Sequence, residues 1–221
     1  MENKVVKVMF TGDSVTDVGR ARPIGDGAGK IGDSYVANLF CKIWANYPNN
    51  VLRILNSAIS GNTTRDLIQR FDEDVVAYKP DYLFIMIGVN DAWRRVECFL
   101  SNEVITSDQE IKENYVNMVK KCKDNGIVPI FISPLYFDID HKNTFRKHVD
   151  GIQKTIKEVC AEYSVGYIDV QSKVDKYMKA SDNNCYRFGG DRVHPNAIAK
   201  TIIADCIYAS PEFKKVLKHN A

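Results

Sequence analysis

The sequence predicts an α/β protein, a three-layer α/β/α sandwich built on a five-stranded parallel sheet. Two observations lead to this fold class. Short apolar runs rich in β-branched and aromatic residues recur along the chain, and such runs are typical of buried parallel strands. Longer amphipathic stretches separate them, which indicates helices on both faces of the sheet. Because the 221 residues contain no linker, repeat or low-complexity stretch, we expect a single domain over residues 1–221.

The expected elements follow from these runs in order. The strands are predicted at residues 5–10, 51–56, 82–87, 128–133 and 166–170. The helices are predicted at residues 34–47, 64–78, 107–125, 145–163, 170–179 and 195–210. Asn125-Gly126 is a good helix stop, and Pro195 suits a first helical position. Ligands of such sheets bind beyond the carboxyl ends of the strands, so functional residues are sought in the loops after each strand.

The composition excludes several classes of protein. Hydrophobic residues make up 45% and charged residues 26% of the chain, which is ordinary for a globular protein and excludes intrinsic disorder. The formal charge of +2 is too small to predict a nucleic-acid or membrane partner. No apolar run has the length of a membrane span, and Lys4 and Lys7 interrupt the N-terminal run, so a cytoplasmic location is expected.

The six cysteines form no Cys-x-x-Cys pair. Cys41, Cys122, Cys160 and Cys206 fall in the helical patterns, where reduced cysteine behaves as a small apolar residue. They are therefore expected to be buried thiols.

The first strand leads into Thr11-Gly12-Asp13-Ser14. Ser14 lies where the chain turns out of the sheet, which suits an exposed nucleophile, although a simple turn is the alternative. Asp13 and Asp17 are expected to hold this loop by hydrogen bonds rather than to act as acids, and Asp13 is also a candidate substrate-binding residue. A second Gly-Asp-Ser ends at Ser34, but it precedes a helix, so Asp33 or Ser34 is interpreted as an N-cap.

The next two strands also end in candidate residues. Gly61 follows the second strand and can present a bare backbone N–H to a ligand. Asn90 follows the third strand in a Gly-x-Asn-Asp loop and offers a side-chain amide; both are also common turn residues. Trp93, after that loop, is a candidate for stacking on a sugar or for covering the core. Arg94 is a candidate for pairing with an acid or for binding substrate hydroxyls.

A candidate base lies near the C-terminus, in Asp191-Arg192-Val193-His194-Pro195. The Asp191 carboxylate, three residues earlier, can reach one ring nitrogen of His194 and leave the other free. His141 lies in a polar run interpreted as a solvated loop, with a weak cation site as the alternative. The glycine run at residues 27–32 follows no strand, so it does not predict a dinucleotide site.

In combination these motifs are far more specific than each is alone. A strand followed by Gly-Asp-Ser, then Gly61, then Gly-x-Asn-Asp, then Asp-x-x-His-Pro resembles the SGNH hydrolases, the GDSL esterase/lipase family. The wider runs Gly12-Asp13-Ser14-Val15-Thr16-Asp17 and Gly88-Val89-Asn90-Asp91 resemble the family's bacterial intracellular xylan or xylo-oligosaccharide acetylesterases. Val15 is a conservative departure from their usual isoleucine.

The resemblance implies a flavodoxin-like SGNH fold and a serine esterase. Its catalytic residues would be Ser14, His194 and Asp191, with an oxyanion hole formed by Ser14, Gly61 and Asn90. It implies a small-molecule ester substrate such as an acetylated sugar, no cofactor or metal, and assembly into homo-oligomers. A lysophospholipase, thioesterase or arylesterase of the same fold is the alternative, and a non-catalytic binding module is a third class.

Overall fold

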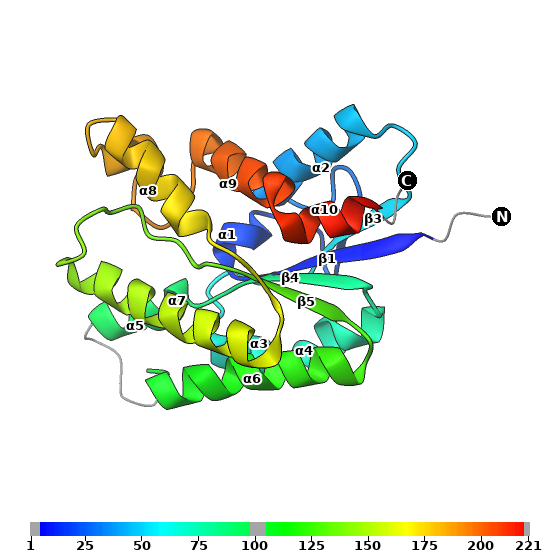
Figure 1. The fold of residues 1–221 in the computed structure, drawn as a ribbon, viewed down its shortest axis with the longest axis horizontal. Helices are drawn as coiled ribbons and strands as arrows, with labels where there is room; N and C mark the ends of the chain where they lie inside the picture. Colours follow the sequence, from blue (N-terminus) through cyan, green and yellow to red (C-terminus); the bar gives the residue numbers. More distant parts are fainter. Residues whose placement is uncertain (1–4, 98–104, 219–221) are drawn as a thin grey trace.

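One mixed sheet with helices on both faces forms the protein (Figure 1), described for residues 5–97 and 105–218 by a computed structural model. The strand order is β2-β3-β1-β4-β5-β6. The strands are β1 (Val6–Gly12), β2 (Gly25–Asp26), β3 (Leu52–Asn56), β4 (Tyr82–Met86), β5 (Val128–Ile132) and β6 (Gly166–Ile168). Every neighbouring pair is parallel except β2 and β3, so the predicted fold class is confirmed.

The sheet has six strands rather than the predicted five. The additional strand is β2, which pairs antiparallel with β3 through Gly25–Asn56 and Asp26–Leu55. Two residues are too few to show a strand period, and glycine and aspartate are depleted in strands. Tertiary contacts stabilise β2 instead, since the Arg53 side chain on β3 pairs with the Asp26 carboxylate.

The helices divide between the two faces of the sheet (Figure 1). One layer contains α2 (Tyr35–Asn46), α8 (Val170–Ala180), α9 (Ala197–Ala209) and α10 (Pro211–Lys218). The other contains α3 (Thr64–Gln69), α4 (Phe71–Asp74), α5 (Val89–Val96), α6 (Asp108–Asp124) and α7 (Thr144–Tyr163). The short α1 (Ser14–Asp17) follows β1, and two 3-10 turns, Val76–Tyr78 and Cys185–Arg187, complete the elements.

Side-chain caps begin several helices. The Ser34 hydroxyl accepts the Val36 N–H at 3.2 Å and starts α2, so the capping role predicted for this second Gly-Asp-Ser is confirmed. Asn196 caps α9 in the same way, accepting the N–H groups of Ile198 and Ala199. Such caps satisfy N–H groups that have no partner inside the helix.

Parts of the predicted helix layout are wrong. The last of the predicted helices begins at Ala197 after the Asn196 cap, so Pro195 lies outside it and not at its first position. The single helix expected at residues 64–78 is broken at Arg70 and again at Val75, where the backbone leaves helical geometry. The loop expected after β4 is instead the helix α5, so Asn90 lies in a first helical turn. Val89 and Ala92 are buried on α5, and this packing, which the short segment does not reveal, stabilises the helix.

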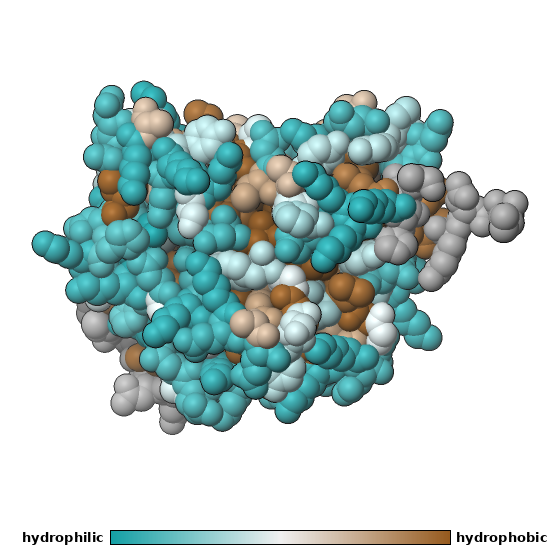
Figure 2. Space-filling view, in the orientation of Figure 1, coloured by the Kyte–Doolittle hydropathy of each residue, from teal (hydrophilic) through white to brown (hydrophobic). Residues whose placement is uncertain are grey.

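The core lies on both faces of the sheet. Phe10 on β1 stacks on Phe84 on β4 with ring centroids 5.0 Å apart. From the side shown in Figure 2 the surface is mostly hydrophilic, and hydrophobic groups show in the seam between the two helical layers. None of the described helices is long and apolar enough to cross a membrane.

The thiols are buried only in part. Cys122 and Cys160 are buried as predicted, whereas Cys41 is exposed and Cys206 is half-buried. Cys41 lies on α2 between the buried Leu39 and Ile43, and its position in the helical turn points it outward.

Candidate active site

The candidate site lies at the carboxyl end of β1. In the sheet, β3 lies on one side of this strand and β4 on the other, so the order of the strands reverses at β1. Such a switch point opens a crevice in which α/β proteins bind ligands. The loops after β3 and β4 therefore lie on either side of Ser14, the residue that begins α1.

A continuous chain of hydrogen bonds joins three of the predicted residues. The Ser14 Oγ lies 2.8 Å from His194 Nε2, although 180 residues separate the two in sequence. His194 Nδ1 lies 2.5 Å from Asp191 Oδ2. This is the arrangement by which a carboxylate orients an imidazole and the imidazole accepts a proton from a serine.

The turn that presents Ser14 requires glycine at position 12. Gly12 has φ 152°, and a Cβ there would lie 1.9 Å from the carbonyl oxygen of Met86 on β4. The next residue, Asp13, caps α1 by accepting the Val15 N–H at 3.0 Å. The prediction that Asp13 holds the loop by hydrogen bonding is thus consistent with its position.

Asp13 is also an unusual carboxyl group. It is 1% exposed, and this burial raises its pKa to about 7. The Val15 N–H and the nearby His194 oppose the increase, while the negative charge of Asp91 adds to it. Near neutral pH the group is therefore poised between its two protonation states.

The segment that carries His194 is held by its own carboxylate. Asp191 Oδ1 accepts the N–H groups of Val193 at 2.9 Å and of His194 at 2.8 Å. Burial alone would raise the pKa of Asp191, but the hydrogen bonds from the His194 side chain and from these two amides hold it below its ordinary value. Asp191 is therefore ionised at neutral pH and can stabilise a protonated imidazole.

The predicted oxyanion-hole residues Ser14, Gly61 and Asn90 line one groove. Among the described residues, neither the Ser14 N–H nor the Gly61 N–H has a protein acceptor. Gly61 adopts φ 81°, a conformation that favours glycine. The Asn90 side-chain nitrogen donates one hydrogen to the Asn62 carbonyl at 2.9 Å, and its second hydrogen remains for a ligand.

An open groove with a cavity volume of about 420 Å³ surrounds these groups. Trp93 lines it, with its ring 6.2 Å from that of His194 and edge-on to Phe145 at 5.9 Å. Both roles considered for Trp93 are thus available to it. Arg94 also lines the groove and donates to the Gly61 carbonyl at 3.1 Å. The lining residues are Ser14, Ser60, Gly61, Asn90, Trp93, Arg94, Glu97 and His194.

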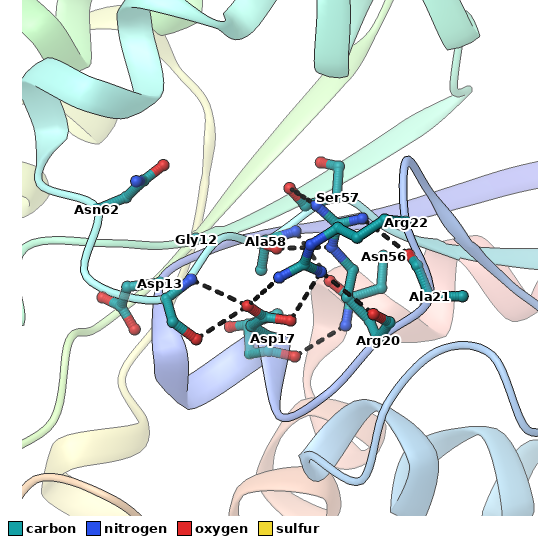
Figure 3. A network of polar contacts seen from close by, with 12 residues as sticks. Gly12, Asp13, Asp17, Arg20, Ala21, Arg22, Asn56, Ser57, Ala58 and Asn62 are labelled. Atoms are coloured by element: carbon teal, nitrogen blue, oxygen red, sulfur yellow. Dashed lines mark hydrogen bonds and ion pairs between the residues drawn. The ribbon is translucent and has the colours of Figure 1, made fainter.

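Asp17 was expected to hold a loop by hydrogen bonds, but the sequence did not indicate the arginines that help it to hold the 57–62 loop. Asp17 accepts the Ser60 N–H at 3.0 Å and the Ser60 hydroxyl at 2.8 Å. It also pairs with Arg22 at 2.6 Å (Figure 3). Arg20, 4% exposed, donates to the carbonyls of Ala58 at 2.6 Å and Ser57 at 3.2 Å (Figure 3).

Arg70 is the other side chain that was missed. It donates to the Ser57 and Gly12 carbonyls and to the Asn62 side chain. A signal for it was available, because Arg70 falls three residues after Leu67 and just before Phe71, both of them buried. An arginine at the edge of a buried helical face needs internal acceptors.

The other histidines lie apart from this groove. His141 Nδ1 is 2.7 Å from Asp150, and its side chain is 64% exposed, as expected for a solvated loop. His148 lies on α7. No group of three histidine, cysteine, aspartate or glutamate side chains within residues 5–97 and 105–218 is arranged to hold a metal ion.

This fold and this set of side chains define a serine ester hydrolase. The chain belongs to the GDSL-like lipase/acylhydrolase family, whose model matches residues 10–200. The resemblance seen in the motifs is thereby confirmed.

A known enzyme is similar over most of the chain. The acetylxylan esterase of Geobacillus stearothermophilus is 35% identical over 199 residues, which is 90% of each protein. Its crystal structure covers 92% of both chains with a TM-score of 0.88. Similar structures include catalytic mutants of that esterase in which a serine, a histidine or an aspartate is replaced by alanine.

Two further relatives are less informative about function. An α/β-hydrolase enzyme from the metagenome of Lake Arreo, Spain, is 30% identical, with a TM-score of 0.87 over 92% of this chain and 94% of its own. An uncharacterized lipoprotein of Bacillus subtilis is 42% identical over 82 residues, which is 37% of this chain and 32% of that protein.

Proposed function

We propose that the protein removes acetyl groups from acetylated xylo-oligosaccharides or related sugars, with Ser14 as nucleophile, His194 as base and Asp191 as its partner. The observation that carries this proposal is the hydrogen-bonded chain from Ser14 Oγ through His194 to Asp191. It lies in a groove with the Asn90 amide and with the backbone N–H groups of Ser14 and Gly61, which have no acceptor among the described residues. A non-catalytic binding module would have no need of this combination.

The proposed reaction passes through an acyl-serine. His194 Nε2 takes the Ser14 proton as Oγ attacks the ester carbonyl, and Asp191 stabilises the resulting imidazolium. The carbonyl oxygen becomes an oxyanion held by the N–H groups of Ser14 and Gly61 and by the Asn90 side chain. The sugar hydroxyl then leaves with the proton from His194. A water molecule, activated by His194 in turn, releases acetate and restores Ser14.

The character of the groove supports a sugar substrate. Its lining combines the Trp93 ring with the charged side chains of Arg94 and Glu97, and an aromatic face beside polar groups suits a hydroxyl-rich ring. The similarity to an acetylxylan esterase over 90% of the chain supports the same substrate class.

A substrate panel tests the proposal. The enzyme is assayed side by side on acetylated xylo-oligosaccharides, a lysophospholipid and an acyl-coenzyme A thioester, with Ser14→Ala as the blank. We expect acetate release from the oligosaccharides at the highest kcat/KM, unchanged by a metal chelator. A preference for the lysophospholipid or thioester would overturn the sugar assignment and favour the alternative acylhydrolase.

We further infer a cytoplasmic enzyme that assembles with copies of itself. Cell fractionation with an antibody, and light scattering of the purified protein, are the measurements that test these two expectations. Recovery in the membrane fraction, or a mass of a single chain, would contradict them.

A further inference from the structure

We propose that Arg70 is a positioning residue for the oxyanion hole, holding the segments that carry the Ser14, Gly61 and Asn90 donors in one arrangement. The inference rests on the proposed function, because it takes those three groups as the donors. Arg70 does not touch the reacting atoms and lines no part of the groove. It acts on the backbone behind them.

The contacts of Arg70 reach the end of β1 and both ends of the 57–62 loop. One NH group donates to the Gly12 carbonyl at 3.2 Å, two residues before Ser14. Another donates to the Ser57 carbonyl at 2.8 Å, where the chain leaves β3. The Nε–H donates to the Asn62 side chain at 2.6 Å, next to Gly61. Four of the five guanidinium N–H groups are used once the Asp74 carboxylate, at 2.9 Å, is included.

These contacts connect all three donors. The Gly12 carbonyl also accepts the Ile59 N–H at 3.0 Å. This hydrogen bond joins the end of β1 to the loop after β3. Asn62, whose side chain Arg70 holds, accepts the Asn90 amide through its own carbonyl. A displacement of Arg70 would therefore move the Ser14, Gly61 and Asn90 donors relative to one another.

Only a guanidinium can make this set of contacts. Its planar fork presents donors in several fixed directions, whereas a lysine ammonium is a compact charge with three donors on a flexible chain. The Arg70 side chain is 14% exposed, so water cannot readily replace lost contacts. The break between α3 and α4 falls at Arg70 itself, where the chain turns above these loops.

The test compares Arg70→Lys with the matched control Arg65→Lys. Arg65 lies five residues earlier, on α3. It donates two hydrogen bonds to the Glu110 carboxylate, at 2.5 and 2.7 Å, and does not line the groove. Two quantities are measured per active site, counted by fluorophosphonate labelling: kcat/KM for 4-nitrophenyl acetate, and the Ki of phenylboronic acid. The boronate forms a tetrahedral serine adduct and places an oxygen where the oxyanion develops.

We expect Arg70→Lys to lower kcat/KM about 10- to 100-fold. This loss is no larger than the loss expected when one direct oxyanion donor is removed. The boronate Ki should rise by a similar factor. Arg65→Lys should change both less than about threefold. A role in folding alone would reduce the number of active sites but leave both constants per site unchanged, and that result overturns the proposal. So does full activity in Arg70→Lys, because charge alone would then suffice.

A second variant covers the case in which Arg70→Lys does not fold. Asn62→Ala removes the acceptor of the Arg70 Nε–H and keeps the carbonyl that binds Asn90. It should shift kcat/KM and the boronate Ki in the same direction by a smaller factor, and equal values to wild type would contradict the proposal. Failure of the proposed function is distinguishable, since Ser14→Ala would then keep its activity whatever Arg70 does.

Discussion

Ser14 and Ser34 occupy identical Gly-Asp-Ser triplets in different settings. Ser14 follows a buried strand and lies 2.8 Å from His194, whereas Ser34 is fully buried and caps α2. The two triplets are identical, so the neighbouring elements decide the role of each serine hydroxyl: Ser14 follows strand β1, whereas Ser34 precedes helix α2.

These settings predict opposite outcomes for two alanine variants. Ser14→Ala should lower kcat for 4-nitrophenyl acetate more than about 1,000-fold, since no nucleophile remains. Ser34→Ala should keep kcat within about threefold and lose roughly 1 kcal/mol of unfolding free energy with its cap. Esterase assays and urea unfolding of both variants check this. Fluorophosphonate label found on Ser34 would contradict our placement of the site.

The buried carboxyl of Asp13 makes stability depend on pH. Its pKa in the folded protein is about 7, above its ordinary value of 3.8, so the folded state binds the proton more tightly than the unfolded state does. The contribution of Asp13 to stability is then greatest at low pH and is lost as pH rises toward 7.

Asp13→Asn removes this titration and keeps an oxygen to cap α1. Between pH 5 and pH 8 the unfolding free energy of the variant, relative to wild type, should rise by roughly 2–3 kcal/mol. Urea unfolding at the two pH values measures it. A difference between the proteins that stays constant over this range would show that Asp13 does not titrate there.

At the scale of elements, the loops after β1 and β3 both depend on glycine, but for different reasons. Gly12 has no room for a side chain, because the β4 backbone lies against it, whereas a Cβ on Gly61 would meet nothing within 4 Å. At Gly61 a side chain would be disfavoured only by the positive φ of the backbone, not by a steric clash.

Gly12→Ala is therefore expected to cost at least about 3 kcal/mol of unfolding free energy, since β1 and β4 would have to separate. Gly61→Ala should cost only about 1–2 kcal/mol, the penalty of a left-handed conformation. Thermal and urea unfolding compare them. Equal losses in the two variants would mean that steric contact with Met86 does not decide the outcome.

At the scale of the whole molecule, the groove limits which acyl groups benefit from binding. The groove is open, and the described residues that line it, Trp93, Arg94 and Glu97 among them, do not form a long apolar channel. A longer acyl chain would remain in water, so its extra methylenes would contribute little.

We expect kcat/KM to be higher for 4-nitrophenyl acetate than for the butyrate or octanoate, after correction for spontaneous hydrolysis. An enzyme that buries the chain should gain about 0.8 kcal/mol, close to fourfold, for each methylene. A steady rise toward octanoate would therefore sink the acetylesterase proposal and support a lipid substrate.

The sequence by itself determined the layout of this protein. Buried parallel strands are continuous apolar runs, so the five parallel strands could be predicted, and with them the segments after β1, β3 and β4 that contain Ser14, Gly61 and Asn90. In a parallel sheet those segments leave by one edge, and for that reason their meeting could be expected. The Asp191–His194 contact across three residues could be expected as well, but His194 follows α8 and a 3-10 turn rather than a strand, so its place beside Ser14 is a tertiary result.

Only the tertiary structure decided how the loops are held. Strand β2 forms because it can pair with the edge of β3. The helix break at Arg70 occurs where its side chain binds carbonyls up to 58 residues away in sequence. Arg20 and Arg70 bind backbone oxygens, which every residue possesses, so no pattern of side chains reveals these partners. Hydrophobic periodicity records which face is buried, whereas the acceptors of a buried guanidinium depend on where distant segments come to lie.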